Sequence, residues 1–93
     1  MTITIHYQTQ IRRAVGTAAE TIDLPPGSGL PELLERLADR HGDAFRRLVL
    51  VGGKAINGSI LLFVGDTQVS PLDQSIPLND GDVVTFLAPM AGG

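Results

Sequence analysis

Hydrophobic and polar positions alternate along the first strand-like part of the chain. Residues 2–7 place Ile3, Ile5 and Tyr7 on one face, with polar side chains between them. This is the period-two pattern of a half-buried strand. Residues 18–24 alternate in the same way, with Ile22 and Leu24 inward. We therefore predict an antiparallel hairpin from these two segments, joined by a turn region over residues 8–13.

The next segment has the period of a helix. Pro31 stands in the first turn, where its missing amide hydrogen costs nothing, and Gly42 is a natural stop. Apolar residues recur between them at three- and four-residue spacing, at Leu30, Leu33, Leu34, Leu37 and Ala38. The pattern predicts an amphipathic helix with one buried stripe. The charged residues opposite, which are Glu32, Glu35, Arg36, Asp39 and Arg40, are interpreted as a solvated face and not as a catalytic carboxylate pair.

Strand patterns dominate the second half of the chain. Residues 59–64 are a continuous apolar run of strand length, and residues 65–69 turn into a short strand. Asn79 to Asp82 have turn chemistry, and Val83 to Leu87 supply the β-branched and aromatic side chains of a final strand. Residues 44–48 are interpreted as a short helical turn. Residues 49–51 have two interpretations: they are either the packed end of that turn or a brief strand. A loop over 52–58 follows.

The predicted order is strand, strand, helix, strand, short strand, strand. One helix packed across one face of a mixed sheet is an α+β roll, and a hairpin-helix-hairpin order is typical of the β-grasp, or ubiquitin-like, fold. We therefore expect a mixed sheet of four to five strands with one main helix on one face. The domain spans residues 1–88, and residues 89–93 form a flexible tail.

The chain ends in two glycines that follow closely on a proline. Pro89 lacks the amide hydrogen that a strand ladder needs, so Met90, Ala91, Gly92 and Gly93 should project from the sheet. A chance Gly-Gly pair would end about one chain in 200, and a frayed terminus is the simpler interpretation. The position at the end, four residues after a strand-stopping proline, favours a functional tail, because residues without β-carbons can thread a narrow enzyme channel.

Composition excludes several classes of function. The 93 residues suffice for one domain, and 43% hydrophobic with 18% charged residues is globular and not disordered. The net charge is −3 and the arginines fall in separated pairs, so nucleic acid is not an expected partner. The chain has no cysteine, which excludes disulfides and thiolate chemistry. No apolar run approaches the roughly 20 residues of a membrane span, and a signal-peptide start is absent, so we expect a cytoplasmic protein without a membrane partner.

Two further patterns are not interpreted as sites. His6 and His41 have no second ligand at suitable spacing, so no metal site and no catalytic histidine is predicted. The glycine-rich residues 52–58 contain Lys54, but their spacing does not match a phosphate-binding loop and no strand-to-helix context follows.

Three segments together resemble the MoaD/ThiS family of ubiquitin-like sulfur carriers. They are residues 64–69, residues 78–84 and the end Ala88-Pro89-Met90-Ala91-Gly92-Gly93. The resemblance spans the chain in element order. Within the family, the chain is similar to the small subunit of molybdopterin synthase. Gly65 stands where the family usually has asparagine. The segment of residues 43–59 is longer than in the most compact members of the family and is more similar to carriers of the CysO type.

The resemblance implies a carrier and not an enzyme. Gly93 would be adenylated by an ATP-dependent activating enzyme of the ubiquitin-activating type and then converted by a sulfur donor to a thiocarboxylate. Pro89, Met90, Ala91 and Gly92 would thread the partner's active site. The carrier would bind no cofactor itself, since ATP is used by the activating partner. The sulfur would pass to an acceptor enzyme such as a synthase large subunit, with molybdopterin-type chemistry favoured.

Alternation also predicts an apolar partner-binding patch. Val84 and Phe86 should face the helix, which turns Leu87 outward, and by the same rule Leu61 and Phe63 face outward from the neighbouring strand. Leu61, Phe63 and Leu87 would then form one patch beside the tail. The alternative is that residues 43–58 cover some of them.

Two other functions use the same fold. A small modifier would be conjugated through Gly93 to lysines of target proteins. A plain β-grasp interaction module would act only through its apolar face, with the two glycines incidental.

Overall fold

The structure is a computed structural model that describes residues 1–51, 55–56, 60–69 and 76–87. Five strands form one mixed sheet in the order β2-β1-β7-β5-β6. The strands are β1 (Thr2–Gln8), β2 (Ala19–Asp23), β5 (Leu61–Val64), β6 (Thr67–Val69) and β7 (Val83–Leu87). β1 and β7 are parallel, and the other neighbours are antiparallel. The predicted α+β, β-grasp architecture is confirmed.

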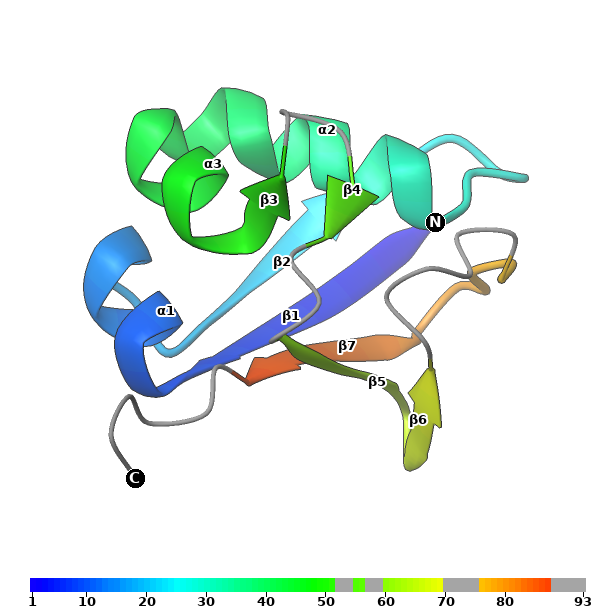
Figure 1. The fold of residues 1–93 in the computed structure, drawn as a ribbon. Helices are drawn as coiled ribbons and strands as arrows, with labels where there is room; N and C mark the ends of the chain where they lie inside the picture. Colours follow the sequence, from blue (N-terminus) through cyan, green and yellow to red (C-terminus); the bar gives the residue numbers. More distant parts are fainter. Residues whose placement is uncertain (52–54, 57–59, 70–75, 88–93) are drawn as a thin grey trace.

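The helices lie on one face of this sheet (Figure 1). The main helix is α2 (Leu30–His41), and all five apolar residues of its predicted stripe are buried. Its first turn is closed by the Glu32 side chain, which accepts a hydrogen bond from the backbone N–H of Gly29 at 3.3 Å. At the other end Gly42 adopts φ +69°, a backbone conformation that favours glycine and lets α2 stop.

The predicted turn over residues 8–13 is wrong. β1 continues to Gln8, and residues 9–15 form a second helix, α1 (Thr9–Val15), which Gly16 ends with φ +82°. Ile11 is fully buried and Val15 packs against the core. These two residues are four apart and so face the same way on a helix, but a single pair is too short a pattern to distinguish from a turn.

Residues 43–56 contain a third helix and a separate two-stranded sheet. α3 (Asp43–Val49) runs into β3 (Leu50–Val51), which pairs with β4 (Ala55–Ile56) in antiparallel register. The predicted helical turn and the brief strand are therefore both present. The expectation of a loop throughout residues 52–58 is wrong at β4, and the rest of that range lies outside the described residues.

The core fills the space between the helices and the sheet. Phe86 of β7 lies at its centre, stacked on Tyr7 with ring centroids 6.1 Å apart and meeting the edge of Phe45 from α3 at 6.0 Å. All three side chains are at most 1% exposed. Because β7 lies between β1 and β5, it is hydrogen-bonded along both edges. Its inward residues also pack in the core, so both kinds of contact hold the final strand in place.

Candidate functional site

The final strand β7 positions the end of the chain. It is hydrogen-bonded on both sides, with Leu87 opposite Gln8 of β1 and Leu61 of β5. α1 begins directly after Gln8 and contacts β7. Leu87, the last described residue, therefore lies in the middle of the sheet and beside the start of α1. The predicted tail residues Pro89, Met90, Ala91, Gly92 and Gly93 lie outside the described residues, and their role stays a prediction.

The turn before β7 fixes the register of this strand. Asp82 donates its N–H to the Asn79 carbonyl at 3.0 Å, and Gly81 adopts φ +86° as the predicted turn requires. The Asp80 carboxylate accepts a hydrogen bond from the backbone N–H of Thr2 at 2.7 Å. This ties the turn to β1, so β7 cannot slip along its neighbours without breaking these bonds.

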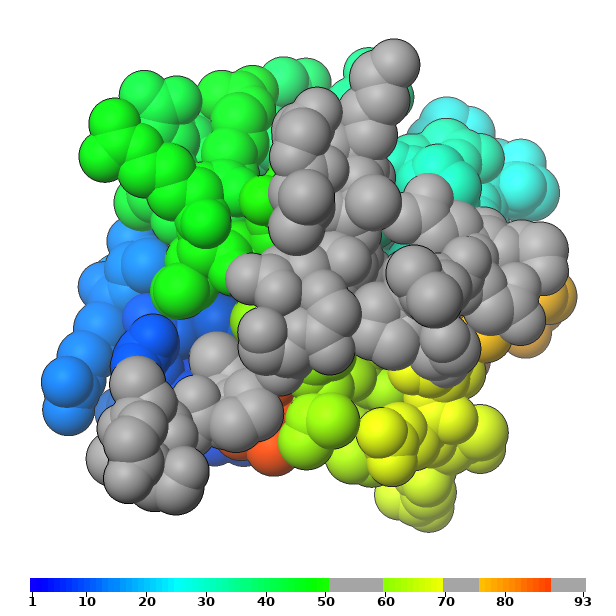
Figure 2. Space-filling view, in the orientation of Figure 1, coloured from blue at the N-terminus to red at the C-terminus, as the bar shows by residue number. Residues whose placement is uncertain are grey.

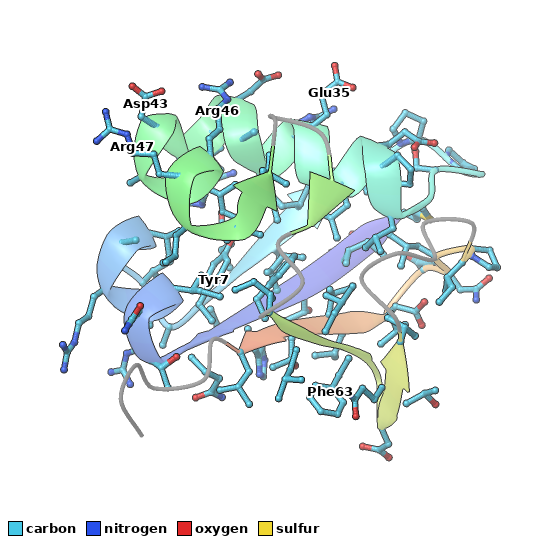
Figure 3. The ribbon with its side chains drawn as sticks, in the orientation of Figure 1. Tyr7, Glu35, Asp43, Arg46, Arg47 and Phe63 are labelled. Atoms are coloured by element: carbon cyan, nitrogen blue, oxygen red, sulfur yellow. The ribbon has the colours of Figure 1, made fainter. Side chains whose placement is uncertain are left out.

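The predicted outward patch has the orientation that alternation indicates. Leu61 and Leu87 are directly opposed across β5 and β7, and Phe63 is opposed to Thr85. All four side chains are half-buried, whereas Phe86 next to them is fully buried on the other face. Figure 3 shows Phe63 pointing away from the helices. The described parts of residues 43–58 lie with the helices on the opposite face (Figure 1), so they do not cover the patch. Its role in partner binding stays a prediction.

A polar cluster lies inside the fold where the sequence analysis predicted none. The Glu20 carboxylate accepts a hydrogen bond from the Tyr7 hydroxyl at 2.6 Å, contacts His41 Nε2 at 2.5 Å and pairs with Arg40 Nε at 2.9 Å. The Glu20 and His41 side chains are only 9% and 12% exposed. The interpretation of Arg40 as part of a purely solvated face is therefore incomplete, because its guanidinium closes this cluster at the surface.

The signal for this cluster was present in β2 but weak. Glu20 has the same parity as Ile22 and Leu24 and so faces the core. An inward glutamate needs donors, because a buried carboxylate without partners is costly. Neither β2 nor its alternation indicates that the donors come from β1 and from the end of α2. The cluster satisfies its own polar atoms, and we assign it a structural role.

Titration of Tyr7 should reveal the cluster. Burial, reinforced by the Glu20 hydrogen bond and charge, raises the pKa of the phenol far above its ordinary value. Because the pKa of this hydroxyl is higher in the folded than in the unfolded state, its contribution to the free energy of unfolding is fully present below the unfolded pKa of about 10. The contribution is lost as the pH rises above that value. The chain has one tyrosine and no tryptophan, so ultraviolet absorbance reports this residue alone.

We expect no tyrosinate signal near pH 10 in the folded protein, and a signal that appears only together with unfolding at higher pH. Tyr7→Phe is the control, because it should remove this alkaline loss of stability and leave only the contribution of the lysine and arginine side chains. A normal titration near pH 10 without unfolding would contradict the buried placement of the hydroxyl.

Other kinds of site are not seen in the described ranges. No group of three or more histidine, aspartate or glutamate side chains could hold a metal ion there. His6 is exposed on the outer face of β1, opposite to the face on which Tyr7 contacts His41. None of the described helices is long and apolar enough to cross a membrane.

The strand order, with α2 across one face and β7 at the centre, defines a β-grasp protein of the ubiquitin-like class. Solved structures of this kind match over the whole chain. SAMP1 from Haloferax volcanii has a TM-score of 0.85 at 14% identity, covering 100% of both chains. A Pyrococcus furiosus protein described as molybdopterin converting factor subunit 1 has a TM-score of 0.77 at 26% identity, covering 97% of this chain and 99% of that one.

A third match is the Amycolatopsis orientalis BexX/CysO complex, with a TM-score of 0.70 at 23% identity and coverage of 98% of this chain and 99% of that one. A search of curated proteins finds no match. The model of the ThiS family matches residues 5–93. The chain therefore belongs to the ThiS family, a family of ubiquitin-like sulfur carriers.

Proposed function

We propose that this chain carries sulfur as a thiocarboxylate on Gly93. The observation that supports the proposal most is the extent of the family match, which runs to residue 93 and so includes both terminal glycines. The fold supports it as well, because β7 is the central strand that leads into the tail. We infer a carrier with no catalytic residues of its own, which acts as the substrate of other enzymes.

The chemistry requires activation by a partner. A carboxylate is a poor electrophile, so an adenylating enzyme would use ATP to form the Gly93 acyl-adenylate and release pyrophosphate. A sulfur donor then attacks the acyl carbon, AMP leaves, and a thiocarboxylate remains. The contribution of the carrier is to position this sulfur inside the acceptor enzyme, where it is shielded from water.

We favour a molybdopterin-type acceptor. The support is the likeness, at 26% identity, to the Pyrococcus furiosus protein described as molybdopterin converting factor subunit 1. A synthase large subunit would then be the acceptor. The Amycolatopsis orientalis structure, in which a CysO is in complex with BexX, supports the more general idea that a carrier of this fold docks on an enzyme.

We propose that the outer face of β5 and β7 is the docking surface for these partners. Leu61, Phe63 and Leu87 form a half-buried apolar patch on a face that the described helices leave open. The patch ends at Leu87, the last described residue before the tail. An enzyme that covers the patch would therefore also lie beside the start of the tail, so docking and tail insertion would be coupled.

The test is the intact mass of the protein after incubation with ATP, sulfide and the adenylating enzyme of the same organism. We expect a mass gain equal to the replacement of one oxygen by sulfur, and its complete loss when Gly93 is deleted. Thr67→Asp, an exposed change on β6, is the folded control and should react like the wild type. No mass gain with an active cognate enzyme would overturn the proposal.

Two other results would identify the alternatives. Adducts in cells that link Gly93 to lysines of other proteins, without thiocarboxylate, would indicate a modifier. Full biological function after deletion of Gly92 and Gly93 would indicate an interaction module that uses only the sheet face.

A further inference from the structure

Two polar side chains of β1 border the apolar patch on the outer face of the sheet. β1 is the parallel neighbour of β7, and its register places Gln8 directly opposite Leu87 and His6 directly opposite Thr85. Tyr7 between them is buried on the helical face, so His6 and Gln8 point to the outer face, where the patch lies. Both are exposed. We call His6 and Gln8 the β1 border.

Neither side chain of the β1 border has a partner in the described part of the chain. Gln8 accepts a hydrogen bond from the Thr9 hydroxyl at 2.8 Å, but through its main-chain carbonyl. The His6 imidazole and the Gln8 amide form no hydrogen bond or ion pair with another described residue. A docked partner that displaces water from these groups must therefore supply hydrogen bonds in its place, because a buried polar group without a partner is costly.

An interface of ordinary size is wide enough to include the β1 border. Neighbouring strands lie about 4.8 Å apart, so Gln8 is roughly 5 Å from Leu87, and His6 is roughly 10 Å from Phe63, two strands away. A typical interface buries about 800 Å² on each partner, which corresponds to a disc of roughly 32 Å diameter. A partner centred on the apolar patch would therefore cover both side chains of the border.

The β1 border also lies beside the start of the tail. Gln8 is opposed to Leu87, the last described residue before residues 88–93. Figure 2 shows the red end of β7 at the surface, next to the yellow-green β5. A contact at Gln8 would therefore restrain the carrier close to the point where the tail begins.

We infer that the β1 border orients the docked carrier on the adenylating enzyme, through hydrogen bonds that the enzyme offers to Gln8 and His6. This inference rests on the proposed function. Apolar contact is non-directional, so the patch can hold the carrier without fixing its rotation about an axis perpendicular to the sheet. Hydrogen bonds along one side of the patch are directional, and they would select the rotation in which the tail enters the active site.

The two side chains define the groups expected on the enzyme. The Gln8 amide carries both a donor and an acceptor, so a main-chain peptide group, which carries the same pair, matches it. An imidazole has at least one N–H in each protonation state, so an acceptor oxygen opposite His6 fits all of them. The expected enzyme surface is therefore apolar where it meets the patch, with an exposed peptide group and an acceptor oxygen along one side.

The experiment compares the same substitution on the two sides of the patch. Gln8→Ala removes the amide beside Leu87, and Gln68→Ala is the matched control, because Gln68 is an exposed glutamine opposed to Phe63 on β6. Gln68 lies roughly 12 Å from Leu87, across two strand spacings and two residues along, so a contact there restrains the tail less. Pyrophosphate release by the purified adenylating enzyme, with ATP and sulfide, is measured against carrier concentration to give kcat and KM.

We expect Gln8→Ala and His6→Ala each to lower kcat/KM by about 2- to 10-fold, the range for the loss of one hydrogen bond. Part of the loss should appear in kcat at saturating carrier, because carriers held by the patch in other rotations occupy the enzyme without reacting. Gln68→Ala should leave kcat unchanged. His6→Gln keeps an N–H donor and should lose less than His6→Ala. All four variants should unfold in urea close to the wild-type midpoint, since the substituted side chains are exposed.

Each other outcome contradicts the inference. A higher KM with unchanged kcat would make the β1 border a contact that holds the carrier without orienting it, and equal effects of Gln8→Ala and Gln68→Ala would exclude the assignment to one side. Self-association of the wild type that Gln8→Ala abolishes would assign the border to a second copy of the chain. If the wild type is not adenylated at all, the proposed function fails; if it is adenylated and the border variants are silent, only this inference fails.

Discussion

Phe86→Ala is expected to lower the free energy of unfolding by about 3–5 kcal/mol. The ring is fully buried on the central strand β7 and contacts the Tyr7 ring of β1 and the Phe45 ring of α3. Its removal leaves a cavity between elements that cannot collapse independently, because β7 is paired on both sides. For a domain of this size such a loss is a large part of the total stability.

Urea unfolding followed by circular dichroism measures this effect. Leu87→Ala is the matched control, because it is the next residue on the same strand but faces outward and is only half-buried. We expect a loss well below that of Phe86→Ala. Equal losses at the two positions would contradict the alternation of β7 and would place Leu87 in the core.

Phe63→Asp is expected to weaken binding to the adenylating enzyme by roughly 30-fold or more while changing stability little. The side chain lies in the middle of the outer face, opposite Thr85 of β7 and Gln68 of β6. In a docked complex a carboxylate here would lose its water without gaining a partner, which is costly. In the free protein the half-exposed position keeps the new charge hydrated.

Calorimetric titration of the enzyme with each variant measures the affinity. Thr67→Asp introduces the same charge at an exposed position of β6 and should bind within a few fold of the wild type. The loss at Phe63 should persist at high salt, because it reflects apolar contact and not an attraction between surface charges, which salt screens. Equal affinities for the two aspartate variants would exclude the sheet face as the docking surface.

Much of the fold could be predicted from the sequence because its elements bury one face each. The alternation of β1 and the period of α2 survive in the structure, since every inward residue of these patterns is buried. The bounds of β7, Val83–Leu87, agree with the prediction because a turn precedes the strand and a proline follows it. The direction of Leu61, Phe63 and Leu87 followed from the same alternation.

Short or mixed patterns were less informative. α1 has only Ile11, Ala14 and Val15 at helical spacing, which is one turn, so the pattern fits a turn as well as a helix. β4 is two residues long and exists only because β3 lies beside it. Such elements are decided by the partner against which they pack, and periodicity within the segment does not contain that information.

The sequence by itself determined which face of each long element is apolar, where the final strand stops, and that the chain ends in two glycines. Only the tertiary structure decided which elements meet. It brought Tyr7, Glu20 and His41 into one buried cluster, and it placed the final strand β7 between β1 and β5 in the middle of the sheet. The physical reason is that periodicity reports the direction of a side chain relative to its own element, whereas its neighbours are set by how the elements pack.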